Sequence, residues 1–487
     1  MRIDFLLVLS SIFLLLPTTA QCQEDSLVPQ LYDSYADFME PTLNKRRIKY
    51  QQLQPLIHTF RENPKFVVQK VGESIEGRDL TLLSIGTGEI DIFLWSQMHG
   101  NEPTATLAIF DILNFLDSDA FKSEKNTILS KLKLHFLPML NPDGAEVYQR
   151  RNALGIDINR DALRLQSPEG RTLKKVRDSL DADFGFNLHD QSIYYNAERT
   201  EKPATISYLA TAYNYEKDIN AIRANAMKVI VFMNNIIQAY APGQVGRYND
   251  DFEPRAFGDN IAKWGTSLIL IESGGYINDT EKQEIRKLNY VSILAALHAI
   301  ANDGYQDIPI AEYEMIPRND RKLFDLKIAN ATYELLGKMY VLDLGIYRQE
   351  VDLQGHNAFY YKSSIVDQGD LSTYYGYETF DASGYTIIPP KYEGSTVYKK
   401  SDIASYLNAG IAYVGYNSLS KLTHHDSPIH LIKRDFKEGG FILAPGQNPT
   451  FFLAKEGKLA YAVINGFIID LNSPLSEQKL GNALLYR

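Results

Sequence analysis

The sequence predicts an α/β fold: a mixed, mostly parallel sheet with helices on both faces, followed by a smaller C-terminal domain that is mostly β. Two observations support this expectation. Between about residues 33 and 303, short apolar runs alternate with amphipathic helical patterns. After residue 303, short β-type runs and turns replace the helical patterns. The change in pattern predicts two domains.

In the first part, three apolar runs have the length and composition of buried strands. They are 92–95, 134–137 and 268–271. Between the first two, apolar residues from Ile109 to Leu116 recur at the spacing of one face of a helix. Longer helices are expected over 219–240 and 281–300. This alternation is typical of a sheet covered by helices.

The second part begins after a linker that contains Pro309 and Pro317. We expect the first domain at 33–303, the linker at 304–321 and an accessory β-rich domain at 322–487. Expected strands in the accessory domain include 324–326, 340–344, 451–453 and 460–464, the last before an Asn465-Gly466 turn signal.

The charge of the chain argues against nucleic acid as a partner. The formal net charge is −10, and no long basic run occurs. Phosphate binding depends on clustered Lys and Arg.

The N-terminus has the pattern of an export signal over residues 1–20. Arg2 precedes an apolar stretch from Phe5 to Leu16, and small residues end at Ala20. The stretch is short for a membrane span, so no transmembrane segment is expected in the mature chain, although an uncleaved anchor is the alternative. The only cysteine is Cys22, where Gln21 disfavours lipid attachment. Export without a disulfide predicts a periplasmic or secreted protein of a bacterial envelope.

Two histidines and a carboxylate form a candidate metal site. His99 and Glu102 follow a predicted buried strand and open a helix, and His189 ends another apolar segment. Two imidazoles and one carboxylate make the ligand set of a catalytic zinc site with one open position. Taken singly, each piece has a plainer explanation, namely a surface pair for His99 and Glu102 and a structural histidine for His189.

Polar residues between these motifs could orient a ligand or a substrate. Asp157 could accept the second ring N–H of His99 and so fix its tautomer. Arg150, Asn159 and Arg160 offer donors that match a carboxylate. A surface salt-bridge cluster is the alternative, and for Arg151 it is the preferred one.

Glu272 follows the apolar run 268–271 and precedes Ser273-Gly274-Gly275. It should therefore lie at the end of a buried strand, where such sheets bind ligands. Burial raises the pKa of a carboxyl group toward neutrality, which suits a general base. The alternative is a glutamate that caps the Gly-Gly loop.

In this order, the motifs resemble the zinc carboxypeptidase family typified by carboxypeptidase A. The likeness begins with Val71 to Arg78 and continues through the motifs at 99–102, 141–144, 150, 157–160, 189 and 272. It covers roughly residues 35 to 300. Each motif is weak by itself, but the ordered set is highly specific.

The resemblance implies a zinc carboxypeptidase-like fold and an enzyme that cleaves the C-terminal peptide bond of peptides with a free C-terminus. It implies one Zn²⁺ per chain, with His99, Glu102 and His189 as ligands. Glu272 would act as general base, and Arg150 would polarise the scissile carbonyl. Asn159 and Arg160 would hold the terminal carboxylate of the substrate.

Three positions differ from the family pattern or match it only roughly. Asn101 replaces an arginine of carboxypeptidase A, so one contact to the substrate is expected to differ. Asp190 replaces a small residue, which predicts a more acidic pocket. Tyr248 is only a rough counterpart of the tyrosine that covers the substrate.

Segments of the second part resemble the small β-sandwich of amidohydrolases. They are 324–331, 369–389 and 463–466. In amidohydrolases a catalytic barrel splits this sandwich. Only about fifty residues separate the two halves here, too few for a barrel, so the domain is expected to be accessory.

Other functions on the same fold stay open. One is an amide hydrolase like aspartoacylase or succinylglutamate desuccinylase, whose His-Gly-Asn-Glu form occurs at 99–102. Another is a cell-wall peptide hydrolase. The third is a non-catalytic binding protein, although the presence of His99, Glu102, His189 and Glu272 argues against it.

Overall fold

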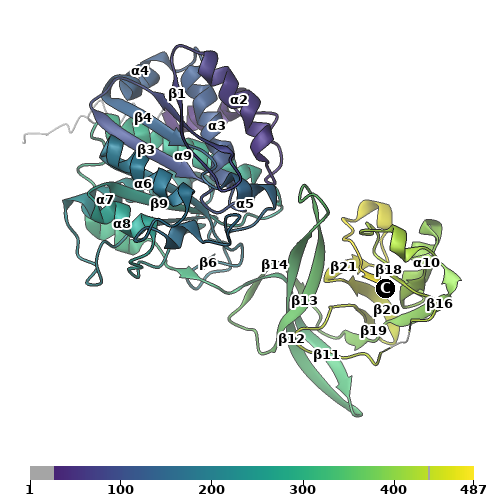
Figure 1. Cartoon of the computed structure of the whole chain (residues 1–487). Helices are drawn as coiled ribbons and strands as arrows, with labels where there is room; N and C mark the ends of the chain where they lie inside the picture. Colours follow the sequence, from purple (N-terminus) through teal and green to yellow (C-terminus); the bar gives the residue numbers. More distant parts are fainter. Residues whose placement is uncertain (1–26, 437–438) are drawn as a thin grey trace, which may run out of the picture.

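The computed structural model describes residues 27–436 and 439–487. It consists of two parts joined near residue 320 (Figure 1). The first part holds an eight-stranded sheet. The second part holds another sheet, in which seven strands follow one another and an eighth pairs beside them, and a separate four-stranded sheet. The predicted export signal and Cys22 lie outside the described residues. Among the described residues, no helix combines the length and apolar character needed to cross a membrane.

The sheet of the first part is mixed, and its four central strands are parallel. The strands in spatial order are β1 (Val67–Glu73), β2 (Asp79–Ile85), β4 (Leu132–Leu137), β3 (Ile90–Ser96), β5 (Phe184–Asp190), β9 (Ser267–Ser273), β7 (Ile206–Ala210) and β8 (Val245–Arg247). The predicted strands 92–95, 134–137 and 268–271 fall within β3, β4 and β9. The fold class predicted from the sequence is therefore confirmed.

Helices cover both faces of this sheet. One face packs against α2 (Tyr50–Glu62), α3 (Thr104–Asp117), α4 (Lys122–Lys131), α7 (Ala221–Tyr240) and α9 (Gln283–Ala301). The other face packs against α6 (Pro168–Leu180) and α8 (Phe257–Lys263). Shorter elements are α5 (Pro142–Glu146), three-residue 3₁₀ turns at Tyr35–Asp37 and Ile158–Arg160, and the two-residue strand β6 (Asn196–Ala197).

Strand β3 shows why the sheet is buried on both sides. Ile92 and Leu94 belong to the larger apolar core, whereas Phe93 and Trp95 belong to the core on the opposite face. Successive side chains of a strand point to opposite faces, so an unbroken apolar run places apolar groups in both cores. All four side chains are 1% exposed or less.

A buried ion pair ties the N-terminal segment to two helices of the larger core. Asp111 of α3 accepts hydrogen bonds from Arg286 of α9, with Nε 2.7 Å from Oδ2. The same carboxylate accepts from Tyr35 Oη at 2.9 Å and from the backbone N–H of Glu40 at 2.7 Å. Neither charged side chain is exposed to solvent. Such a pair needs all of these partners because desolvation of both charges is costly.

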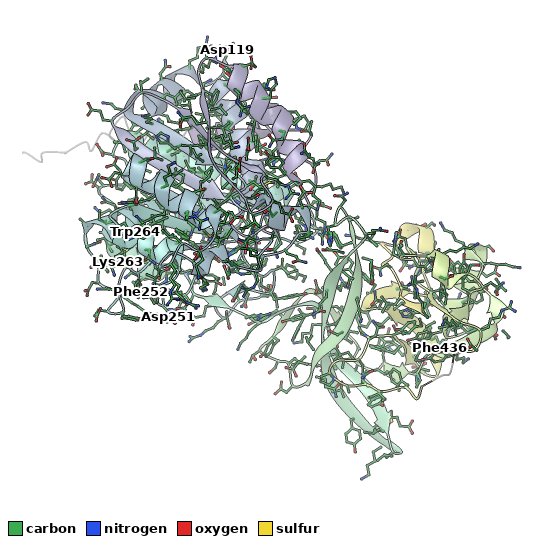
Figure 2. The ribbon with its side chains drawn as sticks, viewed as in Figure 1. Asp119, Asp251, Phe252, Lys263, Trp264 and Phe436 are labelled. Atoms are coloured by element: carbon green, nitrogen blue, oxygen red, sulfur yellow. The ribbon has the colours of Figure 1, made fainter. Side chains whose placement is uncertain are left out.

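The second part is mostly β, as the sequence predicts. Its main sheet runs β13 (Phe359–Gly369), β12 (Lys338–Asp352), β11 (Leu323–Leu335), β15 (Thr386–Ile388), β19 (Phe451–Lys455), β20 (Lys458–Ile464) and β21 (Phe467–Asp470), and β14 (Tyr375–Asp381) pairs with β11. The predicted strands 324–326, 340–344, 451–453 and 460–464 fall in β11, β12, β19 and β20. Figure 2 shows side chains of both parts meeting where β12, β13 and β14 approach the first part.

A smaller sheet, which the sequence did not reveal, packs beside the main one. Its parallel strands are β16 (Lys391–Val397), β17 (Ile411–Gly415), β18 (His430–Ile432) and β22 (Leu485–Tyr486). It is accompanied by α10 (Ile403–Asn408) and by 3₁₀ turns at Lys400–Asp402, Leu419–Lys421 and Leu475–Glu477.

The segment expected to be a linker is partly structured. It contains the 3₁₀ helix η3 (Ile310–Met315) and the short strand β10 (Asn319–Asp320), which pairs with β6 of the first part. Tyr313 of η3 is buried, and its hydroxyl accepts a hydrogen bond from the backbone N–H of Ala210 at 3.0 Å. The predicted domain limits at 303 and 322 stay predictions.

Candidate metal centre

The candidate site lies where the central parallel strands end. β3, β5 and β9 run in the same direction, so their C-terminal ends meet at one edge of the sheet. His99 follows β3 by three residues, and His189 lies near the end of β5. Glu272 lies near the end of β9 and is the register partner of His189. Strand order thus brings together residues that are far apart in sequence.

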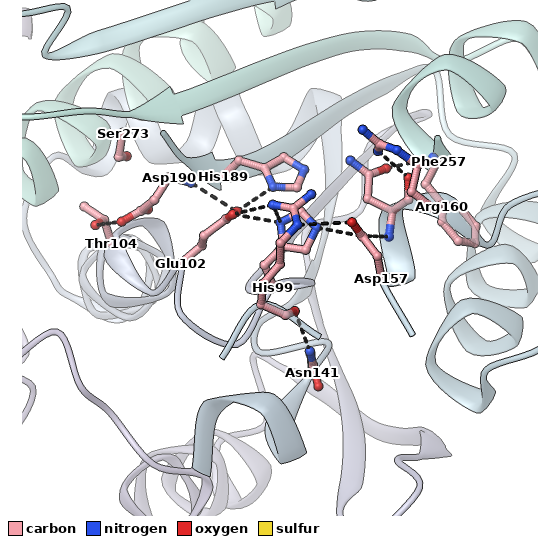
Figure 3. Close-up of polar contacts among 12 residues, drawn as sticks. His99, Glu102, Thr104, Asn141, Asp157, Arg160, His189, Asp190, Phe257 and Ser273 are labelled. Carbon is pink, nitrogen blue, oxygen red and sulfur yellow. Dashed lines mark hydrogen bonds and ion pairs between the residues drawn. The ribbon is translucent and has the colours of Figure 1, made fainter. Parts of the chain in front are cut away.

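Three side chains converge at this edge, as Figure 3 shows. His99 Nδ1 lies 2.8 Å from Glu102 Oε1, and His189 Nδ1 lies 2.7 Å from Glu102 Oε2. One ligand atom from each residue falls within 4.8 Å of the others, and all three residues are buried. The three predicted ligands could therefore hold one metal ion.

The outer ring nitrogens of the two histidines have different surroundings. His99 Nε2 lies 3.1 Å from Asp157 Oδ1, the contact expected from the sequence. If Nε2 donates to this carboxylate, the Nδ1 lone pair faces the cluster. His189 Nε2 is buried and has no hydrogen-bond partner among the described residues.

Arg150 places a cation beside the same atoms. Its Nη1 lies 3.1 Å from His99 Nδ1 and 3.2 Å from Glu102 Oε1, while Nε donates to Asp157 Oδ2 at 3.1 Å. Two imidazole nitrogens and a carboxylate form a donor set that could hold a cation, and the guanidinium of Arg150 lies beside it. The donor set suits Zn²⁺, which binds imidazole and carboxylate ligands.

The loop that carries His99 and Glu102 is fixed by a close backbone approach. A Cβ atom at Gly100 would lie 2.1 Å from the carbonyl carbon of Gly144, so only glycine fits there. Asn141 accepts the N–H of Gly144 and donates to the backbone oxygen of Arg150 at 3.2 Å. The 141–144 turn thus positions both the ligand loop and the Arg150 segment.

Electrostatics separates the two glutamates of the site. Burial of Glu102 would raise its pKa, but the two imidazoles outweigh this effect and lower it, so the carboxylate stays charged. For Glu272, burial raises the pKa well above its usual range, and the nearby carboxylates of Glu102 and Asp190 act in the same direction. A carboxyl group whose pKa is raised binds a proton more readily than an ordinary carboxylate does.

A pocket of about 310 Å³ opens in front of the cluster. Asn159, Arg160, Tyr248 and Glu272 line it together with the proposed ligands. The amide oxygen of Asn159 accepts the N–H of Phe257 at 2.9 Å, at the start of α8. Burial raises the pKa of the Tyr248 hydroxyl, and Glu272 adds to this effect. All predicted site residues except Asp157 line the pocket, and Asp157 contacts His99 from behind.

The structure also identifies residues near the site that the sequence did not single out. Glu253 Oε2 lies 3.5 Å from Arg160 Nε, so a carboxylate of the chain lies beside the predicted clamp. Lys282 Nζ lies 2.9 Å from Asp190 Oδ2, and Thr104 Oγ1 donates to the same oxygen at 2.6 Å. The negative charge expected of Asp190 is thus compensated. Lys282 lies 92 residues from Asp190 in the sequence, so the sequence did not indicate this pairing.

The acidic stretch 250–259 is also largely compensated. Asp250 lies 2.9 Å from Lys217 Nζ and 3.0 Å from Arg223 Nη2. Asp259 accepts the N–H of Glu253 at 2.9 Å, and burial raises the pKa of Asp259 to about 6. These residues line the pocket opposite the proposed ligands, so its polarity at this end depends on few free charges.

Comparison with known proteins identifies the matched part of the chain. The profile of the family described as Zinc carboxypeptidase matches residues 54–179. Residues 54–179 are therefore similar to the zinc carboxypeptidase family. The resemblance expected from the motifs is therefore confirmed. The match includes His99, Glu102 and Arg150, whereas His189 and Glu272 lie beyond its end.

The individual proteins that the chain resembles are distant from it. Carboxypeptidase E of Caenorhabditis elegans is 31% identical over 119 residues, which are 20% of this chain and 25% of that protein. Probable carboxypeptidase 2 of Trichophyton verrucosum is 28% identical over 134 residues, 27% of this chain and 25% of that protein. A solved metallo-carboxypeptidase from Burkholderia cenocepacia aligns at 17% identity and a TM-score of 0.43, covering 52% of this chain and 69% of the other. The chain thus spans about a quarter of the length of these curated relatives.

Proposed function

We propose that the protein is a zinc-dependent carboxypeptidase that removes the C-terminal residue of peptides with a free C-terminus. The observation that carries this proposal is the cluster of His99, Glu102 and His189 beside the buried carboxyl of Glu272. The family of residues 54–179 supports zinc as the metal and peptides as substrates. The predicted N-terminal signal supports action outside the cytoplasm.

His99, Glu102 and His189 would hold one zinc ion per chain. Their atoms already converge, and Asp157 orients the ring of His99. When bound, zinc supplies Lewis acidity, which lowers the pKa of a nearby water and polarises a carbonyl group.

Glu272 would move the proton. Its carboxylate would accept the proton of the attacking water and then donate it to the nitrogen of the leaving amine. Burial supports this role because a raised pKa makes the carboxylate a better proton acceptor than an ordinary glutamate.

Arg150 and Arg160 would act on opposite ends of the terminal residue. Arg150 would donate to the scissile carbonyl oxygen and stabilise its developing negative charge. Arg160 and Asn159 would hold the terminal carboxylate, since a guanidinium offers two parallel donors. Tyr248, in the pocket wall near Glu272, would cover the bound residue.

The test compares two peptides that differ only at the C-terminus. Amidation removes the negative charge that Arg160 would bind, so kcat/KM should fall by roughly 10² or more. Purified protein loaded with Zn²⁺ is assayed by following release of the C-terminal residue. Equal cleavage of both peptides contradicts the carboxypeptidase proposal and favours an amide hydrolase or endopeptidase that uses the same cluster.

A further inference from the structure

A second cavity, of about 820 Å³, lies between the two parts of the chain and is called the interdomain cavity below. The function proposed above does not use it. Its first wall consists of Arg46, Ile193 and the segment that follows β9, from Gly275 to Lys282. The opposite wall comes from β12, β13, β14 and β21 and from residues 479–482. The volume is within the range of pockets that enclose small ligands or several residues of a peptide.

Direct contacts between the two parts hold this cavity in shape. Tyr194 donates to Asp325 Oδ2 at 2.7 Å, and its ring stacks on Tyr347 at 3.7 Å. Tyr377 donates to the backbone oxygen of Ile193 at 2.5 Å. Arg47 contacts Asp352 at 2.6 Å and also pairs with Glu350. Partly buried aromatic and ionic contacts of this kind connect the two parts on either side of the cavity.

The cavity and the catalytic pocket share a wall. Asp190, Gln191, Ser192 and Tyr195 line the catalytic pocket, whereas Ile193 lines the interdomain cavity. Lys282 lines the cavity, and its Nζ contacts Asp190 at 2.9 Å. The segment 190–195 therefore has one site on each side.

The direction of a bound peptide follows from the position of Arg160. In Figure 3, Arg160 lies on one side of the metal cluster, and Asp190 lies on the other. A peptide that places its terminal carboxylate at Arg160 and its scissile bond at the cluster extends from the cluster on the side away from Arg160. On that side the segment 190–195 separates the catalytic pocket from the interdomain cavity, which Ile193 lines.

We propose that the interdomain cavity binds the residues of the peptide substrate that precede the cleaved bond. This inference rests on the proposed carboxypeptidase function and adds a substrate class: peptides of several residues with an apolar or aromatic side chain upstream of the C-terminus. The accessory domain is then part of the substrate-binding surface.

The lining of the cavity supports this class of ligand. Phe359, Tyr360, Tyr361 and Phe467 supply flat apolar surface on the accessory side. The charged groups around them are mostly compensated, since Arg46 pairs with Glu350 and Arg348 pairs with Glu378 at 2.9 Å. A lining that combines aromatic side chains with charges of both signs, several of them paired, favours apolar contact and hydrogen bonding over recognition of an ion.

The first measurement compares substrates of two lengths with wild-type enzyme. A blocked dipeptide spans about 7 Å and fills only the catalytic pocket, whereas an extended heptapeptide spans about 23 Å. With an aromatic residue upstream, the heptapeptide should have at least a tenfold higher kcat/KM. If both lengths are cleaved equally well, the inference fails while the carboxypeptidase function stands. If neither loses its C-terminal residue, the proposed function itself fails.

Two variants on the accessory wall locate the effect. Phe467→Ala and Tyr360→Ala should each raise KM for the heptapeptide by about tenfold and leave the dipeptide unchanged. Phe467→Leu should restore part of the loss. The matched control is Tyr340→Ala, because Tyr340 belongs to the same domain but is exposed and does not line the cavity. Equal losses on both substrates for Phe467→Ala and Tyr360→Ala would overturn the inference.

Binding provides a readout independent of turnover. In a Glu272→Gln background, a fluorescently labelled heptapeptide should bind about tenfold more weakly when Phe467→Ala is added, measured by anisotropy. Unchanged affinity for the heptapeptide would overturn the inference. The inference would also be overturned if a neutral oligosaccharide competed for binding in a way that requires Phe467, while binding of the peptide did not require Phe467.

Discussion

His189 Nδ1 lies 2.7 Å from Glu102 Oε2, although 87 residues separate the two in sequence. The contact is possible because β5 ends beside β3, and the loop after β3 turns Glu102 back across the sheet edge. It converts two weak sequence motifs into one cluster, on which the proposed metal centre depends.

Replacement of His189 by alanine should abolish metal binding. Wild-type protein should contain about one zinc per chain, and His189→Ala should contain much less, because two ligands rarely hold zinc. Metal content is measured by elemental analysis after dialysis. His58→Ala is the control, since His58 is exposed on α2. Full zinc content in a His99→Ala, His189→Ala double variant would show that the metal binds elsewhere.

Glu272→Gln should retain zinc and lose activity. The amide keeps the shape of the side chain but cannot accept a proton, so kcat should fall by a factor on the order of 10² or more. Asp251→Asn, on an exposed rim residue of the same pocket, should leave kcat nearly unchanged. Near-normal turnover of Glu272→Gln would leave Glu272 with only a structural role at the end of β9.

Arg160→Ala should erase the preference for a free C-terminus. Wild-type enzyme should discriminate between free and amidated peptides by roughly 10², since the guanidinium–carboxylate pair is charge-assisted. The variant should cleave both slowly and at similar rates, with zinc still bound. Arg255→Ala is the matched control because Arg255 contacts the same Glu253 as Arg160 does. Retained discrimination in Arg160→Ala would assign the clamp to another residue.

Asp111→Ala should destabilise the first part of the chain by about 3–5 kcal/mol, because it leaves the Arg286 charge buried and unpaired. The change in free energy of unfolding is measured with urea. The control is the more exposed i,i+4 pair of Lys174 and Asp178, in which Nζ lies 2.5 Å from Oδ2. Asp178→Ala should lower the free energy of unfolding by less than about 1 kcal/mol. Similar small costs for both variants would refute the structural role of the buried pair.

The stability of the β-rich second part should fall below pH 6.5 because of His430. This residue is fully buried, its Nδ1 accepts the N–H of Leu484 at 2.9 Å, and burial lowers its pKa from 6.5 to about 3. Between these values the unfolded chain binds a proton that the folded chain excludes, so stability decreases as pH falls. The loss from pH 6.5 to 4 should be roughly 3 kcal/mol.

A variant separates this effect from the titration of carboxylates. His430→Asn removes the group, so its unfolding free energy should depend less steeply on pH between 6.5 and 4. Unfolding is followed by urea denaturation at several pH values. Parallel pH profiles for wild type and His430→Asn would show that His430 does not titrate on unfolding.

Much of the fold follows from local patterns in the sequence. The apolar run 92–95 and the stripe from Ile109 to Leu116 predict a buried strand and a helix, and they correspond to β3 and α3. Such elements are predictable because burial on two faces needs a continuous apolar run, whereas burial on one face needs helical periodicity. The parallel sheet β16–β17–β18–β22 was not predictable, because its strands are short and its last strand is far away in sequence.

The order of the motifs along the chain was enough to single out the candidate residues and the family that residues 54–179 match. Tertiary structure alone decided which of them meet. His189 and Glu272 lie beyond the matched segment, and they join His99 and Glu102 because parallel strands end at one edge of the sheet. Likewise, Lys282 compensates Asp190, and accessory-domain aromatics face a cavity beside the site. These contacts depend on chain topology, which brings distant segments together and leaves no mark on the local pattern of residues.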